Sequence, residues 1–99
     1  MIHNFLITPK AQRDFDQAFL FYEEQLAALG KEFARCIDAK NTEIQRNPKQ
    51  FQIIYKEKIR RALVSRFPFS IYFINTSDSI TFIAILHQSR NPEKWKSRT

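Results

Sequence analysis

The sequence of 99 residues predicts a single α+β domain in which a helical hairpin packs on one face of a small, mainly antiparallel sheet. Two observations predict this class. Apolar residues recur with a helical period between residues 10 and 46, and from Phe51 onward the period is the alternation of β-strands. The later strands follow one another with short connections, which predicts an antiparallel meander. The predicted order over residues 1–99 is β-α-α-β-β-β-β.

The first strand and the first helix meet at a helix-start signal. Residues 2–8 alternate as a short strand, and Thr8 is a favourable N-cap with Pro9 at the first helical position. Gly30 is the only glycine, and it is expected to end this helix as a left-handed residue. The predicted inward stripe has apolar residues three or four positions apart: Ala11, Phe15, Ala18, Tyr22 and Leu26.

A second helix is predicted from about Lys31 to Arg46, where Asn47-Pro48 ends it. Its inward residues are Phe33, Ile37 and Ile44. The two helices therefore form an antiparallel hairpin that contains seven of the ten acidic residues. Four of these, Asp14, Asp16, Glu23 and Glu24, are expected to be solvated surface groups.

Four strands are predicted after the hairpin, at 53–55, 60–67, 70–75 and 79–87, with a turn at 76–78. The tail from Gln88 is polar and holds the one tryptophan, Trp95.

The last two strands are apolar on both faces. In the first of them Phe69, Ile71 and Phe73 line one face, and Tyr72 and Ile74 the other. Strict alternation in the second assigns Phe82, Ala84 and Leu86 to one face, and Ile83 and Ile85 to the other. The hairpin covers a single face, so the other is covered either by the tail with Trp95 or by a partner chain.

The positive charge lies in the second half of the chain. Residues 1–45 carry five Lys/Arg and seven Asp/Glu, which gives −2, whereas residues 46–99 carry eleven and three, which gives +8. The total is +6. Such asymmetry indicates an anionic partner, either nucleic acid or an acidic protein segment, although a basic surface also serves solubility.

Several classes of function have no signature in this sequence. One glycine allows no phosphate-binding loop, and two histidines with the lone Cys36 make no recognisable metal site, so no cofactor or metal is expected. The N-terminus is unlike a signal peptide and no apolar run reaches the length that spans a bilayer. We therefore expect a cytoplasmic protein that does not engage a membrane.

The remaining candidates are basic and aromatic. Metal-free phosphoryl transfer needs guanidinium groups that hold a phosphate and a group that titrates near neutral pH, and Arg61 and His87 are residues of these two types. Arg61 has the alternative of an ion pair with a helix carboxylate, and His87 that of a hydrogen bond to backbone. The predicted binding surface consists of Lys56, Arg60, Arg66, Tyr72, Ile74, Ile83, Ile85 and Trp95.

The order of several short segments resembles the RelE/ParE superfamily of bacterial toxins, and more closely its ParE-like branch, the plasmid stabilization proteins. The segments are Pro9-Lys10-Ala11 with Asp14 and Phe21-Tyr22-Glu23, Leu29-Gly30 with Phe33, Asn47-Pro48 with Phe51, Arg60-Arg61, residues 66–73, residues 83–87, and Arg90-Asn91-Pro92 with Trp95.

This resemblance implies a growth-arresting toxin of a type II toxin–antitoxin pair, neutralised by an antitoxin with an acidic or amphipathic C-terminal segment. ParE-like members poison DNA gyrase, whereas RelE-like members cleave mRNA on the ribosome without metal and often use a tyrosine near the C-terminus. No tyrosine follows Tyr72, which favours the gyrase branch. The RelE-like endoribonuclease stays open as the alternative, and it implies that Arg61 and Arg90 hold the phosphate while His87 or Lys58 moves protons. Enzymatic activity is therefore undecided, and a non-toxic basic binding module is a second alternative.

Overall fold

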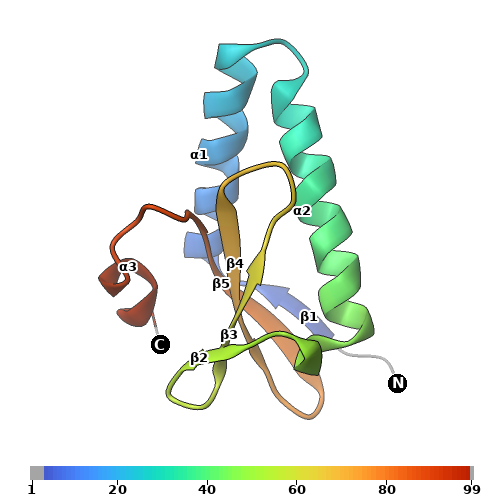
Figure 1. The fold of residues 1–99 in the computed structure, drawn as a ribbon, viewed down its shortest axis with the longest axis vertical. Helices are drawn as coiled ribbons and strands as arrows, with labels where there is room; N and C mark the ends of the chain where they lie inside the picture. Colours follow the sequence, from blue (N-terminus) through green and yellow to red (C-terminus); the bar gives the residue numbers. More distant parts are fainter. Residues whose placement is uncertain (1–3, 99) are drawn as a thin grey trace.

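The structure, a computed structural model, describes residues 4–98 and confirms the predicted order of elements (Figure 1). The elements are β1 (Asn4–Ile7), α1 (Pro9–Gln25), α2 (Leu29–Arg46), the 3₁₀ turn η1 (Pro48–Gln50), β2 (Ile53–Tyr55), β3 (Ile59–Leu63), β4 (Phe69–Asn75), β5 (Ser79–His87) and α3 (Glu93–Lys96). The short helix α3 in the polar tail was not predicted. Residues 2 and 3 of the predicted first strand lie outside the described range.

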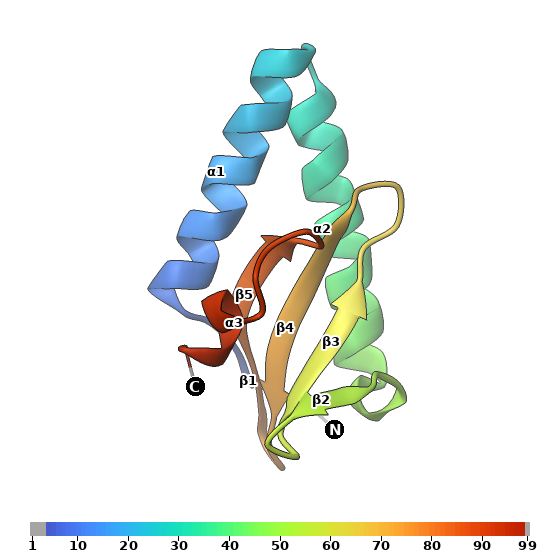
Figure 2. The same ribbon diagram turned by 60° about the vertical axis from the view of Figure 1, so that its left-hand side comes forward.

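One five-stranded sheet has the strand order β1-β5-β4-β3-β2. β2 to β5 form the predicted antiparallel meander, and β1 runs parallel to β5 at one edge. The hairpin of α1 and α2 packs on one face, which we call the hairpin face, and α3 lies on the opposite face, which we call the outer face (Figure 2).

The start of α1 follows the predicted chemistry. The Thr8 hydroxyl accepts a hydrogen bond from the amide of Ala11 at 3.1 Å, with Pro9 at the first helical position. Ala11 and Ala18 are buried, and these small side chains let α1 lie close to the sheet.

The turn of the hairpin differs from the prediction for Gly30. α1 ends at Gln25, the left-handed residue is Ala28 with φ 74°, and Gly30 lies inside α2. A Cβ at Gly30 would stand 2.8 Å from the carbonyl oxygen of Phe19, so glycine permits the close approach of the helices. Leu26, predicted inward, is 65% exposed because the tip of the hairpin projects past the sheet (Figure 1).

The third strand is shorter than predicted. β3 ends at Leu63, and the Val64 amide donates to the carbonyl of Phe69 at 2.9 Å across a tight connection. Arg66 is left-handed there, with φ 72°. Phe67, which the prediction made the last residue of this strand, instead packs edge-on against Phe33 in the hairpin core, with ring centroids 5.3 Å apart.

A β-bulge in β5 overturns the predicted alternation of its faces. Tyr72 pairs with Ala84 while Phe73 pairs with Phe82, so Ile83 is an extra residue opposite β4. Side chains after the bulge change face relative to those before it. Ile85 therefore joins Phe82 in the hairpin core, and Ala84 and Leu86 join Ile83 on the outer face.

The outer face carries its own apolar cluster, covered by the tail. Trp95 of α3 is 6% exposed and stacks on Tyr72, with ring centroids 5.0 Å apart and planes at 18°. Tyr55 meets the same indole edge-on at 5.5 Å. Of the two alternatives for this face, the structure shows the tail covering it.

Candidate functional site

The four candidates for phosphodiester chemistry do not form one constellation. Arg61 pairs with Tyr72 across β3 and β4 and so points to the outer face, where it is exposed. His87 pairs with Phe69 and its ring meets the Phe69 ring at 5.4 Å on the hairpin face. The sheet therefore separates Arg61 from His87.

Lys58 and Arg90 do not bring the four candidates together either. Lys58 lies in the β2–β3 turn, beside the Ile59–Ile74 pair, whereas His87 is level with Phe69 at the other end of β4. Five residues along β4 correspond to roughly 17 Å. Arg90 lies in the loop after β5, and His87 is the one other candidate that lies near it.

The apolar members of the predicted binding surface are mostly covered. Tyr72 and Ile83 are buried under Trp95, and Ile74 is half-buried beside them. Ile85, predicted for the same face, is 2% exposed in the hairpin core because of the bulge.

The basic members of that surface are dispersed. Lys56 is exposed in the β2–β3 turn, with Nζ 5.3 Å from the centroid of the Tyr55 ring. Arg60 is half-buried and donates to the carbonyl of Phe51 at 2.7 Å. Arg66 is exposed and pairs with Glu32 at 3.5 Å. No single surface contains these three side chains together with the outer face.

The structure instead places an open groove between α1 and the segment that runs from β5 into α3. Its apolar half is a hollow of about 330 Å³ lined by Ala18, Tyr22, Phe69 and Ile85, with Phe21 at 55% exposure also lining it. The pKa of Tyr22 is raised by burial of its hydroxyl.

The second half of the groove is a basic hollow of about 320 Å³. Asp14, Gln17, Leu86 and Arg90 line both halves, so the two are continuous. Five cationic side chains line this half against one carboxylate: Lys10, Arg13, Arg90, Lys94 and Arg98. We call the two halves together the α1–β5 groove.

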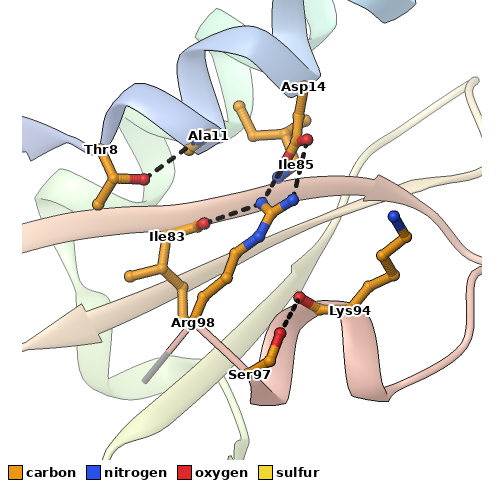
Figure 3. Close-up of polar contacts among 8 residues, drawn as sticks. All are labelled: Thr8, Ala11, Asp14, Ile83, Ile85, Lys94, Ser97 and Arg98. Atoms are coloured by element: carbon orange, nitrogen blue, oxygen red, sulfur yellow. Dashed lines mark hydrogen bonds and ion pairs between the residues drawn. The ribbon is translucent and has the colours of Figure 1, made fainter.

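Asp14 and Arg98 form a two-pronged ion pair beside this groove (Figure 3). Arg98 Nη1 donates to Asp14 Oδ2 at 2.5 Å and Nη2 donates to Oδ1 at 3.2 Å. The side chains of Asp14 and Arg98 are 11% and 13% exposed. The expectation that Asp14 is a solvated surface carboxylate is therefore wrong, and the acidic residue of the groove is already neutralised.

The same pair forms hydrogen bonds with the edge of β5 beyond the point where β1 ends. The last bond on this side is from the Thr8 amide to the Phe82 carbonyl at 3.0 Å, after which the chain enters α1. Asp14 Oδ2 then accepts from the Ile85 amide at 3.1 Å, and Arg98 donates to the Ile83 carbonyl at 3.1 Å. Two side chains thus supply the hydrogen bonds that a longer β1 would have made.

His87 lies at the end of the groove, held by its own loop. Its Nδ1 accepts from the Ser89 amide at 3.1 Å and lies 2.8 Å from the Ser89 hydroxyl. The accepting Nδ1 places the proton of the neutral ring on Nε2. This is the backbone-bonded arrangement that the sequence left as the alternative for His87.

Sequence reasoning missed most of the groove. Lys10 and Arg13 belong to the half of the chain with negative net charge, and Lys94 contributed only to the positive net charge of residues 46–99. The available signal was their spacing: Lys10, Arg13 and Gln17 recur at three and four positions on one face of α1. Nothing in the sequence indicated that β5 and the tail would lie beside that face.

Within residues 4–98, no helix is long and apolar enough to cross a membrane. The same part of the chain contains no group of three or more His, Cys, Asp or Glu side chains arranged to hold a metal ion.

Comparison with solved structures shows that this fold occurs in a known protein. A structure described as the chromosomal ParDE TA system from P. aeruginosa superimposes with a TM-score of 0.76. The match is 19% identical and covers 87% of this chain and 96% of the other, and at that identity it shows the fold. It agrees with the predicted α+β architecture of the RelE/ParE type.

Comparison of the sequence with models of protein families identifies the family of this chain. The model described as ParE toxin of type II toxin-antitoxin system, parDE, matches residues 5–92, and the chain belongs to that family. The predicted membership of the RelE/ParE superfamily, and of its ParE-like branch, is confirmed. Comparison with curated proteins found no match.

Proposed function

We propose that this ParE-family toxin arrests growth by binding DNA gyrase and poisoning it, without cleaving RNA, and that a cognate antitoxin neutralises it. The observation that carries the choice between binding and cleavage is the placement of Arg61 and His87 on opposite faces of the sheet.

Cleavage of a phosphodiester without metal requires the cations and the proton-transferring group at one phosphate, within hydrogen-bond reach of its oxygens. Arg61 and His87 cannot reach the same phosphate across a packed sheet. Lys58, the second candidate for proton transfer, is roughly 17 Å from His87 along the strands. Lys58 and His87 therefore cannot act on the same phosphate. The geometry therefore supports a toxin that acts through surface contacts.

The target is tested by inducing the toxin in cells and by assaying purified gyrase with purified toxin. We expect growth arrest with loss of plasmid supercoiling, and inhibition or poisoning of purified gyrase by purified toxin. Mapping of mRNA 5′ ends should show no cuts in phase with codons.

Arg61→Ala and His87→Ala are the variants that separate the mechanisms. Codon-phased cuts that either substitution abolishes would establish the ribonuclease and defeat the gyrase proposal. Growth arrest with neither cuts nor any effect on gyrase would point to another target. Absence of arrest would contradict every toxin function of this copy.

Neutralisation by an acidic antitoxin is supported by the +8 charge of residues 46–99 and by the open α1–β5 groove. Co-expression of the protein encoded by the adjacent reading frame is expected to restore growth and to co-purify with the toxin. Continued arrest at equal expression of both proteins would contradict this part of the proposal.

A further inference from the structure

The two edges of the sheet differ in how well they resist pairing with another chain. An edge strand presents a row of unpaired backbone N–H and C=O groups, and these can pair with a strand from elsewhere. The β2 edge is protected, because β2 has three residues and its register with β3 shifts between Ile53 and Tyr55. Two charged, left-handed residues, Lys56 and Glu57, follow it directly. Short length, irregular register and charge are the means by which soluble proteins protect an edge.

The β1 edge has none of this protection in residues 4–98. The strand Asn4–Ile7 contains no charged residue and pairs with β5 in a single register. Phe5 and Leu6 are 41% and 55% exposed, and no other strand of the described chain lies beyond β1. Large apolar side chains beside unpaired backbone groups mark an edge that another strand can join.

The unpaired groups of this edge belong to Phe5 and Ile7. The Asn4 amide donates to a carbonyl of the β4–β5 turn at 2.9 Å, and the Thr8 amide donates to a carbonyl of β5 at 3.0 Å, so both amides face β5. The backbone groups of successive residues in a strand alternate between its two sides. The N–H and C=O groups of Phe5 and Ile7 therefore point away from the sheet.

We propose that β1 pairs with β1 of a second copy of this chain, antiparallel and about a two-fold axis at Leu6, to make one continuous sheet. Phe5 of each copy then lies opposite Ile7 of the other copy, and each such pair exchanges both of its N–H···O=C bonds. All the outward N–H and C=O groups of Phe5 and Ile7 are satisfied in this register. A register centred on Ile7 would instead place Phe5 opposite Pro9, which has no N–H to donate.

Apolar side chains meet on both faces of this junction. On the outer face Leu6 lies opposite Leu6 of the second copy, in the kind of cross-strand pair whose side chains approach most closely. On the hairpin face Phe5 meets Ile7 of the second copy. A hollow of about 190 Å³ that Phe5, Ile7, Phe15 and Ile37 line opens beside this pair. The pairing thus covers apolar surface that water contacts in the single copy.

The charges at the ends of the edge favour a second copy as the occupant. Asp78 lies beside Asn4 at one end, and Lys10 is in the first turn of α1, just after the other end. Within residues 4–98 neither of these charged side chains forms an ion pair. Antiparallel pairing brings the Asp78 end of each copy to the Lys10 end of the other, so both contacts are attractive. A uniformly acidic or basic partner strand would meet a like charge at one of the two ends.

The association is expected to be weak. Paired strands of four residues make a small interface, which corresponds to a Kd on the order of 10–100 μM. Each copy also carries a net charge of +6, so long-range repulsion opposes the dimer at low ionic strength. The dimer is therefore tested at about 0.15 M salt, where charges more than about 8 Å apart are screened.

Sedimentation velocity of the full chain, made by cell-free synthesis, measures the dimer across that range of concentration. Leu6→Lys places a charge at the centre of the edge, and Leu63→Lys is the matched control. Leu63 is a leucine of the same 55% exposure, but it lies in β3, between β2 and β4. We expect dimerisation weaker by about tenfold or more for Leu6→Lys and nearly unchanged for the control. A wild-type protein that is monomeric well above the expected Kd, or equal effects of the two substitutions, would overturn the inference.

A disulfide bond tests the register. With Cys36→Ser removing the native thiol, Leu6→Cys places the one cysteine of each chain at the proposed two-fold axis. Residues in such a pair have Cα atoms about 4.5 Å apart, which is within the range that a disulfide spans. Mild oxidation should join the Leu6→Cys chains into a covalent dimer, while Leu63→Cys in the same background stays monomeric. Equal cross-linking of the two variants, or none in either, would contradict the register centred on Leu6.

Amide hydrogen exchange followed by NMR separates a second copy from a segment of the same chain. Below the Kd the outward amides of Phe5 and Ile7 should exchange rapidly, whereas the Leu6 amide, which faces β5, is protected. Above the Kd the exchange of the Phe5 and Ile7 amides should slow severalfold. Protection of both amides in the monomer would mean that another part of this chain covers the edge, and this result would also overturn the proposal.

Discussion

Asp14 of α1 and Arg98 of the C-terminal tail, 84 residues apart in the sequence, share two hydrogen bonds at the edge of β5. The pair ties three segments together, since Asp14 also accepts from Ile85 and Arg98 also donates to Ile83. The tail up to Arg98 is therefore part of the folded unit.

Asp14→Ala should lower the free energy of unfolding by about 3 kcal/mol, because it leaves the mostly buried Arg98 guanidinium and the Ile85 amide without their acceptor. Arg98→Lys should cost less but remain destabilising, since an ammonium cannot reproduce the two-pronged contact. Urea unfolding measures both. A double-mutant cycle with Arg98→Ala should give a clear coupling energy, and additive effects would mean that the pair does not form.

Gly30→Ala and Ala28→Gly are expected to act with opposite signs. At Gly30 the added Cβ meets the Phe19 carbonyl at 2.8 Å, so we expect destabilisation of about 1–3 kcal/mol despite the better helix propensity of alanine. At Ala28, which has φ 74°, glycine relieves left-handed strain and should leave stability unchanged or raise it by up to about 1 kcal/mol. Thermal unfolding followed by circular dichroism compares them. A stabilising Gly30→Ala would contradict the close helix contact.

Trp95→Ala should destabilise the protein by about 3 kcal/mol, because it uncovers Tyr72 and removes the stacked ring. Trp95→Phe keeps most of the apolar contact and is the matched control, with a loss of about 1 kcal/mol. Because Trp95 is the only tryptophan, its fluorescence in the wild-type protein reports this contact directly. A solvent-exposed emission maximum under native conditions would show that α3 does not cover the outer face.

We expect Tyr22 to make the folded protein less stable at high pH. Burial raises its pKa in the folded state above the usual value of about 10, so the native protein retains a proton that the unfolded chain releases. The contribution of this protonated Tyr22 to the free energy of unfolding is fully present below about pH 10 and is lost as the pH rises through the pKa of the folded state. Tyr22→Phe keeps the ring contacts with Phe33 and Phe67 and should reduce this decline. Urea unfolding from pH 9 to 11 measures it, and identical slopes for both proteins would refute the prediction.

Much of the fold was predictable because it depends on local signals. Thr8-Pro9 starts α1 through one hydroxyl and one fixed φ, and Asn47-Pro48 ends α2 by excluding further helix. The turn at residues 76–78 and the alternation in β4 likewise depend on residues that are close together in the sequence. Each of these features involves groups within a few positions of one another.

The errors share a different cause. Gly30 was assigned the role that Ala28 has, because the constraint on Gly30 comes from Phe19 on the neighbouring helix. The faces of β5 were wrong after Ile83 because a bulge adds one residue against β4, and period-two alternation cannot show where a strand stops being regular. Ile85 was consequently placed on the wrong side of the sheet.

The sequence by itself determined the elements, their order, the basic second half and the resemblance to a toxin family, since these are properties of composition, period and spacing along the chain. Only the tertiary structure decided which charges meet. Asp14 is predicted as a surface carboxylate, but in the folded chain it forms an ion pair with Arg98. Lys10, Arg13, Arg90 and Lys94 line one hollow because α1 packs along β5 and the tail. Electrostatic interactions depend on distance in space, and for these residues that distance is independent of their separation in the chain.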